Sequence, residues 1–325
     1  MSRYSFGTGI PTWNGVPMVG GMPQGLTEVF FVDYGAGSDG VNVKSNSLSR
    51  PFKTIAKAYS VITSNKNQGI ALIGNTTHSL TEMLDFSKNR SHLFGFDPGG
   101  RAYGQNAKVS LGVTTAATDI GTVQNTGVRN SFRNIKFINN NTVAEGIYCF
   151  VEAGEYAVID GCEIYKSTNM DVTGAADLVM NGDSAQVLSS TIGSLATARS
   201  GAVIRPNVLM TKGIVSGKVA RDVYFENCKL WINASNAANR FIYGANATDV
   251  ERIMELKGCS FINNGASSAT PGQNVAFGSA LTVGSVLLND CISVNAATAM
   301  STTTGVFVSG AVPAADTSGI ALQAT

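Results

Sequence analysis

Charged side chains are scarce in this sequence. Of its 325 residues, 14% are Asp, Glu, Lys or Arg, and the formal net charge is +1. An average globular protein carries roughly 25% of these residues. The chain has no basic stripe and no acidic tail, whereas sequence-independent nucleic-acid binding relies on clustered Lys and Arg. We therefore expect no nucleic-acid partner.

Long apolar runs are missing as well. No stretch approaches the roughly 18 apolar residues that a membrane helix needs, so we expect no membrane partner. The first seven residues, MSRYSFG, lack the apolar segment of a secretory signal peptide. We therefore expect the chain to fold in a cytoplasm.

Cysteine and histidine are too few and too scattered for a metal site. No CxxC pair occurs, and the two histidines, His78 and His92, lie far from the cysteines in sequence. Zinc sites typically need paired spacing. We therefore expect no metal, no cofactor and five buried free thiols that pack as small hydrophobes. These cysteines are Cys149, Cys162, Cys228, Cys259 and Cys291.

Small residues and residues that favour β-strands are frequent where an average protein would have charged residues. Hydrophobic residues make up 44% of the chain, which is enough for a packed core, and 36 residues are glycine. Together with frequent Ser, Thr, Asn and Ala, this composition indicates short strands joined by many tight turns rather than long helices.

An internal repeat becomes visible when the chain is aligned on its cysteines. Each repeat has a large apolar residue, a polar residue, a small turn-forming residue and then an anchor that is mostly apolar. The predicted anchors, which form an inward row, are Ile135, Cys162, Thr191, Cys228, Cys259 and Cys291. The predicted turn corners are Asn134, Gly161, Ser190, Asn227, Gly258 and Asp290.

This pattern predicts a solenoid. Gly, Asn and Asp adopt the left-handed αL conformation at least cost, and one αL residue between two extended segments turns the chain through a corner. The anchors follow one another at intervals of 27, 29, 37, 31 and 32 residues, as in a stack of coils with loops of varying length. A β-sandwich or barrel, which also has short strands at regular spacing, is the alternative.

The start of the chain carries a family resemblance. Residues 31–35 (FVDYG) lead through a Gly/Ser/Asn-rich loop to residues 51–58 (PFKTIAKA). This arrangement resembles the entry of pectate-lyase-like proteins, and it implies an all-β, single right-handed parallel β-helix of about eight coils with a short N-terminal capping helix near residues 54–63. The expected domains are an arm over residues 1–27, the β-helix over residues 28–300 and a strand-like tail over residues 301–325.

Carboxylates are the candidates for catalysis in such a fold, because general acid–base chemistry needs two of them facing one cleft. The candidate pairs are Asp160 with Glu163, Asp222 with Glu226, and Glu251 with Glu255. The polar column that contains Asp160 and Glu226 also holds Arg133, Ser189, Lys257 and Asn289, a mixture typical of a solvated row. We therefore predict no catalytic, cofactor-binding or metal-binding residues and expect a protein that is not an enzyme.

The N-terminal arm suggests a partner. It is rich in Gly and Pro but carries Phe6, Trp13 and Met18, whose apolar area must be buried against another surface. An arm of this kind on a β-helix resembles bacteriophage virion proteins of the tailspike-like type. The resemblance implies a homotrimeric structural protein in the virion, most simply a capsid decoration protein that contacts the major capsid protein or another virion protein after folding in the host cytoplasm. The alternatives are a tail fibre or spike component and a β-helix carbohydrate-active enzyme such as a polysaccharide depolymerase, so a carbohydrate ligand stays open.

Overall fold

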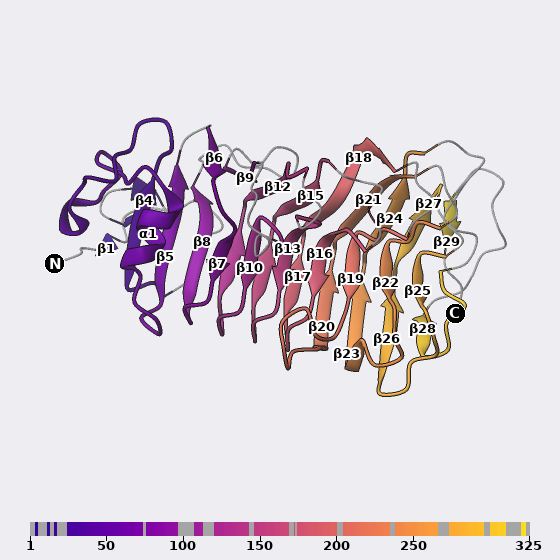
Figure 1. Cartoon of the computed structure of the whole chain (residues 1–325). Coiled ribbons are helices and arrows are strands. Elements are labelled where there is room, and N and C mark those ends of the chain that lie inside the picture. The colour runs from indigo at the N-terminus through magenta and orange to yellow at the C-terminus, as the bar shows by residue number, and fades with distance from the viewer. Residues whose placement is uncertain are drawn as a thin grey trace.

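The structure is a computed structural model, and it describes residues 4–5, 12–13, 16–17, 25–73, 76–96, 107–112, 120–142, 146–168, 172, 174–199, 204–234, 238–265, 273–295, 300–309 and 320–322. Within these residues, three long sheets wind around one core to form an elongated stack (Figure 1). Coil follows coil along the stack, so the N-terminal and C-terminal ends lie at opposite ends of the molecule. The predicted right-handed parallel β-helix is confirmed.

The ten-stranded sheet forms one wall. Its strands all run parallel, and each pairs with the equivalent strand of the next coil. They are β4 (Glu28–Val32), β5 (Gln68–Ile73), β8 (Ser91–Phe96), β11 (Ser131–Arg133), β14 (Val158–Asp160), β17 (Gln186–Leu188), β20 (Ala220–Glu226), β23 (Val250–Lys257), β26 (Gly284–Asn289) and β28 (Val306–Ser309).

The nine-stranded sheet forms the second wall, and from β11 to β26 each strand of the first wall leads into it through one tight corner. It is parallel apart from its last strand, which pairs antiparallel with β27. Its strands are β6 (Thr77–Leu80), β9 (Lys108–Leu111), β12 (Lys136–Asn139), β15 (Glu163–Lys166), β18 (Thr191–Arg199), β21 (Lys229–Ala234), β24 (Ser260–Asn263), β27 (Ile292–Val294) and β29 (Ile320–Leu322).

The seven-stranded sheet closes the coil and is parallel throughout. Its strands are β7 (Leu84–Phe86), β10 (Val123–Asn125), β13 (Tyr148–Glu152), β16 (Ala176–Met180), β19 (Val208–Met210), β22 (Ile242–Gly244) and β25 (Val275–Phe277). Because all three sheets are stacks of equivalent strands, a residue on one coil lies about 4.8 Å from its counterpart on the next.

Apolar side chains from all three walls fill the interior. One apolar residue at the equivalent position of each strand in the ten-stranded sheet points inward and is at most 2% exposed from β4 to β26. These residues are Phe30, Ile70, Leu93, Phe132, Ile159, Val187, Phe225, Leu256 and Leu288. Their neighbours on either side point outward, so the outer face of this wall is free to carry polar groups.

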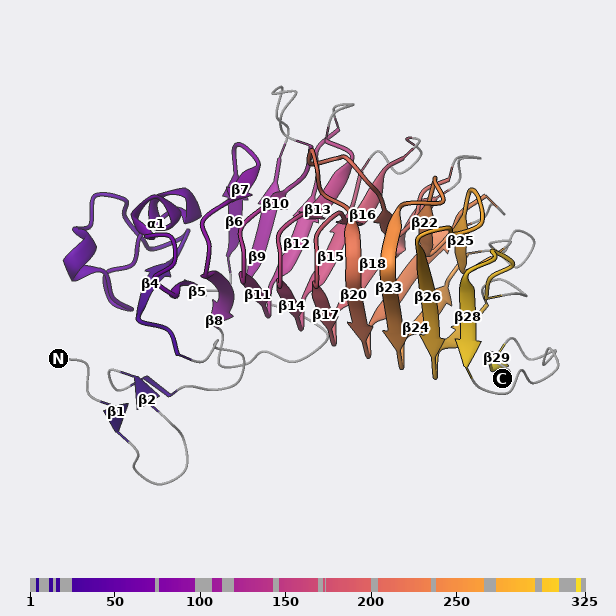
Figure 2. The same ribbon diagram turned by 90° about the horizontal axis from the view of Figure 1, so that it is seen from below.

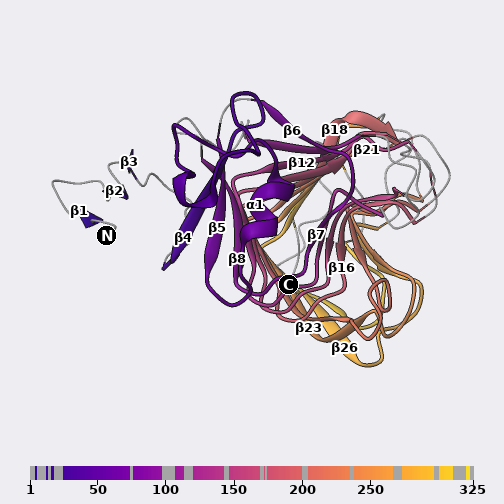
Figure 3. The same cartoon turned by 60° about the vertical axis from the view of Figure 1, so that its left-hand side comes forward.

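A short helix covers the N-terminal end of this core. Helix α1 (Ile55–Val61) buries Ile55 and Ala58 and contacts β4 and β5, and Figure 3 shows it lying across the first coils. Thr54 is its N-cap and accepts a hydrogen bond from the Lys57 amide. The predicted helix near residues 54–63 is therefore present, with slightly shorter bounds.

Short elements precede and follow the β-helix. The strands β1 (Tyr4–Ser5), β2 (Thr12–Trp13) and β3 (Val16–Pro17) form a small antiparallel sheet of their own, which lies to one side of the stack in Figures 2 and 3. The 3₁₀ helix η1 (Val43–Ser45) lies in the loop after β4. Of the predicted docking residues in the arm, Phe6 and Met18 lie outside the described residues, as does the side chain of Trp13.

The cysteine row differs from the sequence prediction at one coil. Asp160 pairs with Leu188, and Glu163 pairs with Thr191. Ser190, not Thr191, therefore occupies the position of Cys162, and Ser189, not Ser190, has the positive φ of 46° at the corner. The inward row is Ile135, Cys162, Ser190, Cys228, Cys259 and Cys291, each at most 2% exposed.

The reason for this error is local. Ser189 and Ser190 are both small and polar, so the sequence offered two equivalent corner positions. The structure places Ser190 inward, where its Oγ accepts a hydrogen bond from the Cys162 amide at 3.1 Å and donates one to the Leu188 carbonyl at 2.8 Å. A serine that satisfies a buried amide in this way can replace a cysteine.

Candidate functional site

The stacking of coils decides which of the predicted carboxylate pairs come together. Asp160 lies on the outer face of β14, paired with Arg133 at 3.0 Å, whereas Glu163 lies past the corner on β15, paired with Lys136 at 2.8 Å. These two carboxylates therefore face outward from different walls. The other two pairs, from β20 and β23, lie on one wall.

Five residues on the outer face of β20, β23 and β26 form a group that we call the carboxylate wall. Tyr224 lies opposite Glu255, and Glu226 lies opposite Lys257. The Glu226 carboxylate is 3.9 Å from the Lys257 ammonium, and Asn289 donates a hydrogen bond to Glu255 at 2.9 Å. From the strand spacing and rise, the Cα atoms of Glu226 and Glu255 are roughly 8 Å apart.

The phenol of Tyr224 lies next to both glutamates. Burial and the negative charges of Glu226 and Glu255 raise the pKa of Tyr224. The phenol therefore stays protonated at neutral pH and can donate a hydrogen bond across the wall.

A second group of charges, which we call the ionic edge, borders the carboxylate wall where β20 and β23 begin. Arg221 bonds Glu251 through Nε at 3.1 Å and Asp183 through Nη1 at 3.2 Å. Arg252 pairs with Asp222 at 2.8 Å and with Asp183 at 3.6 Å. The ionic edge thus holds three carboxylates and two guanidiniums in one network.

A β-bulge shapes the ionic edge. Arg221 pairs with Glu251 and Val223 pairs with Met254, so Arg252 and Ile253 together face the single residue Asp222. Bulges bend a strand and redirect its side chains, and they are common next to functional sites. Here the extra residue brings the Arg252 guanidinium onto the same surface as the predicted acids.

The sequence analysis did not identify Arg221 and Arg252 as candidate site residues. The predicted repeat begins three residues before each anchor, so it does not include Arg221 or Arg252. Extending the repeat upstream sets Arg221 opposite Arg252, because the anchors Cys228 and Cys259 are 31 residues apart. Only the bulge shifts the register so that Arg221 pairs with Glu251.

Neither histidine takes part in this surface, and neither is suited to proton transfer at neutral pH. Burial lowers the pKa of both His78 and His92 to about 4. The two ring nitrogens of His92 also lie 2.8 Å from Ser131 Oγ and from Asn67 Oδ1. Both side chains therefore remain neutral near pH 7.

A buried ionic cluster lies elsewhere, between the nine-stranded and seven-stranded sheets. Asp177 pairs with Arg199 at 2.6 Å and with Arg205 at 3.8 Å, and all three are at most 1% exposed. Burial lowers the pKa of the neighbouring Lys166 to about 8. A polymer cannot reach these buried groups, so they do not form a binding surface.

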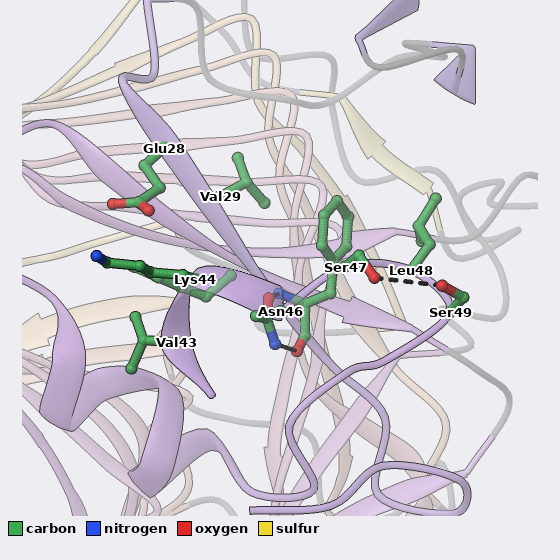
Figure 4. Close-up of a pocket in the computed structure, with 10 residues that line it drawn as sticks. Glu28, Val29, Val43, Lys44, Asn46, Ser47, Leu48 and Ser49 are labelled. Carbon is green, nitrogen blue, oxygen red and sulfur yellow. Dashed lines mark hydrogen bonds between the residues drawn. The ribbon is translucent and has the colours of Figure 1, made fainter. Parts of the chain in front are cut away.

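A separate pocket of about 360 Å³ lies at the N-terminal end, between β4 and the loop after it (Figure 4). The Asn46 amide covers the free edge of β4, because its Oδ1 accepts from the Phe31 amide at 2.7 Å and its Nδ2 donates to the Phe31 carbonyl at 3.0 Å. Glu28 and Lys44 border the pocket. It contains only one carboxylate, so it lacks the paired acids of the carboxylate wall.

No group of three His, Cys, Asp or Glu side chains in the described ranges could hold a metal ion. No helix there is long and apolar enough to cross a membrane.

Comparison with known proteins places the fold. No protein-family model matches the sequence, and no curated protein matches it. The structure is similar to that of pectate lyase Pel9A, with a TM-score of 0.54 and 12% identity over 82% of this chain. It is also similar to a pectin methylesterase from Aspergillus niger, with a TM-score of 0.53 and 14% identity over 96% of this chain and 88% of that one.

The protein has a pectate-lyase-like β-helix fold. The chain spans 63% of the length of the pectate lyase. These neighbours contradict our expectation of a non-enzymatic protein, because the two solved structures are named as a pectate lyase and a pectin methylesterase. They lend no support to a virion role. At 12–14% identity the likeness establishes the fold of this chain, not its reaction.

Proposed function

We propose that this chain is a carbohydrate-active β-helix protein that binds a polysaccharide on the outer face of the ten-stranded sheet and cleaves it at the carboxylate wall. One observation carries the proposal: Glu226 and Glu255 project from adjacent strands beside a protonated Tyr224. Glycoside hydrolysis typically uses two such carboxyl groups on opposite sides of the scissile bond.

The surroundings of the two glutamates suggest their roles. Glu226 faces the Lys257 ammonium, which suits a carboxylate that takes a proton from the attacking water. Glu255 accepts from Asn289 through Oε1, which leaves Oε2 to carry the proton for the leaving oxygen. Tyr224 is placed to position a sugar hydroxyl by hydrogen bonding.

The experiment is an assay for new reducing ends on a panel of bacterial and plant polysaccharides. We expect wild-type protein to cleave at least one of them, and Glu226→Gln or Glu255→Gln to lower the rate by roughly 100-fold or more. Glu163→Gln is the matched control, since Glu163 is an ion-paired surface glutamate on another wall. Absence of cleavage by wild type, or equal rates in all variants, would overturn the proposal.

We further propose that the protein acts as part of a bacteriophage tail fibre or spike. The support is the N-terminal arm, whose short strands β1 to β3 form their own sheet instead of joining the β-helix walls. In this setting residues 1–27 attach the protein to another virion protein, and the β-helix presents its outer face to the polysaccharide.

A further inference from the structure

The inward row has three cysteines on successive coils at its C-terminal end. They are Cys228, Cys259 and Cys291, and we call them the thiol stack. The Ser260 amide donates to the Cys228 carbonyl at 2.9 Å, and the Ile292 amide donates to the Cys259 carbonyl at 2.9 Å. These bonds hold the three cysteines in register, so their Cα atoms follow one another at about 4.8 Å.

The thiol groups of the stack contact one another. The Cys259 thiol forms hydrogen bonds with the thiols of Cys228 and Cys291. Each Sγ also points toward the preceding coil, since Cys259 donates to the Phe225 carbonyl at 3.8 Å and Cys291 to the Leu256 carbonyl at 3.5 Å. A disulfide joins residues whose Cα atoms are roughly 4.4–6.8 Å apart. Neighbouring members of the stack therefore lie within the range of a disulfide.

The other two cysteines have no thiol neighbour in the described chain. On either side of Cys162, the inward row contains Ile135 and Ser190. Cys149 lies in β13, between β10 and β16, and neither of these strands contains a cysteine. Both residues are buried free thiols like the members of the stack, so they serve as internal controls for its chemistry.

We propose that the thiol stack is an oxidation site, at which Cys259 forms a disulfide with Cys228 or Cys291 on exposure to hydrogen peroxide. The bond joins two successive coils near the C-terminal end of the β-helix. Because the three thiols follow one another in one line, a single disulfide forms, and the middle residue always belongs to it. The site lies inside the core, so it is independent of the carboxylate wall.

Burial makes this oxidation slow and sets its starting point. The hydrogen bond with the Cys228 thiol, together with burial, raises the pKa of Cys259 to about 12, so the reactive thiolate is scarce at neutral pH. At the C-terminal end of the stack, Ile292 beside Cys291 is 40% exposed. Local opening of a terminal segment costs less free energy than global unfolding. Cys291 is therefore the member of the stack that a small oxidant reaches first.

The reaction consumes one molecule of hydrogen peroxide. The Cys291 thiolate attacks one peroxide oxygen, the O–O bond breaks, and the departing hydroxide takes up the thiol proton to form water. The Cys259 sulfur then attacks the resulting sulfenic acid, so that the S–S bond forms, the S–O bond breaks and the Cys259 proton leaves in a second water. The two sulfur atoms lose two electrons, and the peroxide oxygens gain them. Attack by Cys228 on the Cys259 sulfur then moves the disulfide by one coil and releases the Cys291 thiol.

The test is prolonged oxidation of the freshly reduced, full-length protein with hydrogen peroxide, followed by intact mass spectrometry, peptide mapping and thiol titration in guanidinium. We expect the intact mass to fall by about 2 Da, because two hydrogen atoms are lost. The number of titratable thiols should fall from five to three. The mapped disulfide should join Cys259 to Cys228 or to Cys291, while Cys149 and Cys162 stay reduced.

Serine variants identify the members of the bond. Cys259→Ser should abolish the disulfide, whereas Cys228→Ser and Cys291→Ser should each keep the one that remains possible. Cys162→Ser is the matched control and should still lose about 2 Da. Serine already occupies the inward row at Ser190, so these substitutions are compatible with the fold.

Ser190→Cys tests the stacking rule by extending the stack to five thiols. We expect a second disulfide and a total mass loss of about 4 Da. Five titratable thiols in wild type after prolonged oxidation would overturn the proposal. A disulfide in Cys259→Ser, a wild-type disulfide that contains Cys149 or Cys162, or sulfinic acid without any disulfide would overturn it as well.

Discussion

At the scale of single residues, the core contains buried thiols. All five cysteines are free and buried. In the inward row each Sγ donates to a main-chain carbonyl of the preceding coil, as Cys162 does to Phe132 at 3.5 Å and Cys228 to Val187 at 3.2 Å. Burial raises the pKa of Cys162 to about 12, so its reactive thiolate form is scarce.

We therefore expect a thiol reagent to label no cysteine in native protein and all five after denaturation. The measurement is titration with an aromatic disulfide reagent in the presence and absence of guanidinium. Rapid labelling of Cys162, Cys228 or Cys259 under native conditions would show that the inward row is accessible, in conflict with the structure.

Glu152 is a buried carboxyl group whose protonation links stability to pH. Its carboxylate is fully buried and accepts from the Asn125 amide at 2.8 and 2.9 Å and from the Gly154 amide at 2.8 Å. Burial outweighs these donors and raises the pKa of Glu152 from 4.5 to about 8. The folded protein therefore holds a proton that the unfolded chain has already released between these two pH values.

A raised pKa means that this contribution to stability is fully present below about pH 4.5 and is lost as the pH rises to about 8. Within that window the free energy of unfolding should fall by up to about 1.4 kcal/mol per pH unit from this group. Glu152→Gln should remove that part of the slope, as measured by urea denaturation at pH 5, 7 and 9. Glu155→Gln, which alters an ion-paired surface carboxylate, should keep the slope; an unchanged slope in Glu152→Gln would refute the assignment.

At the scale of elements, one side chain holds the capping helix to the first coils. The Lys88 ammonium donates to the carbonyls of Tyr59 and Ile62 at 2.6 and 2.7 Å, at the C-terminal end of α1. It also lies 4.8 Å from the centre of the Tyr59 ring, which stacks on Phe86. A cation at this end of a helix satisfies carbonyls that have no partner within the helix.

Lys88→Met should therefore destabilise the cap by about 1–3 kcal/mol, because it leaves these carbonyls without a charged donor. Hydrogen exchange followed by mass spectrometry should show faster exchange over residues 55–62, with little change in the distant coils. Lys66→Met, at an exposed lysine nearby, should leave exchange unaltered. Uniform acceleration over all coils would show that the cap is not a separate unit.

At the scale of the whole molecule, we propose that the protein forms a homotrimer. Several large apolar side chains are exposed near the C-terminal end, including Phe307 at 57%, Val283 at 49% and Ile253 at 48%. A flat β-helix wall can supply the roughly 800 Å² per partner of a standard interface, and exposed apolar groups of this kind mark such surfaces.

Sedimentation should give about three times the 33.9 kDa chain mass at micromolar concentration. Phe307→Asp should shift the protein toward monomer while leaving its circular dichroism unchanged, because Phe307 lies on the outer face of the last strand of the ten-stranded sheet. Thr302→Asp, at a nearby exposed polar position, is the control. A wild-type monomer would refute the trimer.

Deletion of residues 1–24 tests whether the N-terminal arm contributes to the stability of the β-helix. We expect the truncated protein to keep its melting temperature, since β1, β2 and β3 pair only with one another in the sheets of the described chain. Calorimetry provides the measurement. A truncated protein that fails to fold would show instead that the arm covers the first coil.

The sequence by itself determined the coil. Corner residues such as Asn134, Gly161 and Gly258 are chosen for αL backbone, and the apolar residue two positions earlier, as in Phe132, Ile159 and Leu256, must point into the core. Both requirements act within a few residues, so they can be read along the chain without knowing what lies beside it.

Only the tertiary structure decided which residues of neighbouring coils lie opposite one another. The choice between Ser189 and Ser190 depended on which could bond the Cys162 amide. The pairing of Arg221 with Glu251 depended on a bulge at Arg252 and Ile253 in the neighbouring strand. Stacking brings together residues that are a full coil apart in the chain. Because the loops differ in length, the number of residues in a coil varies, and the sequence does not show which residues of neighbouring coils will pair.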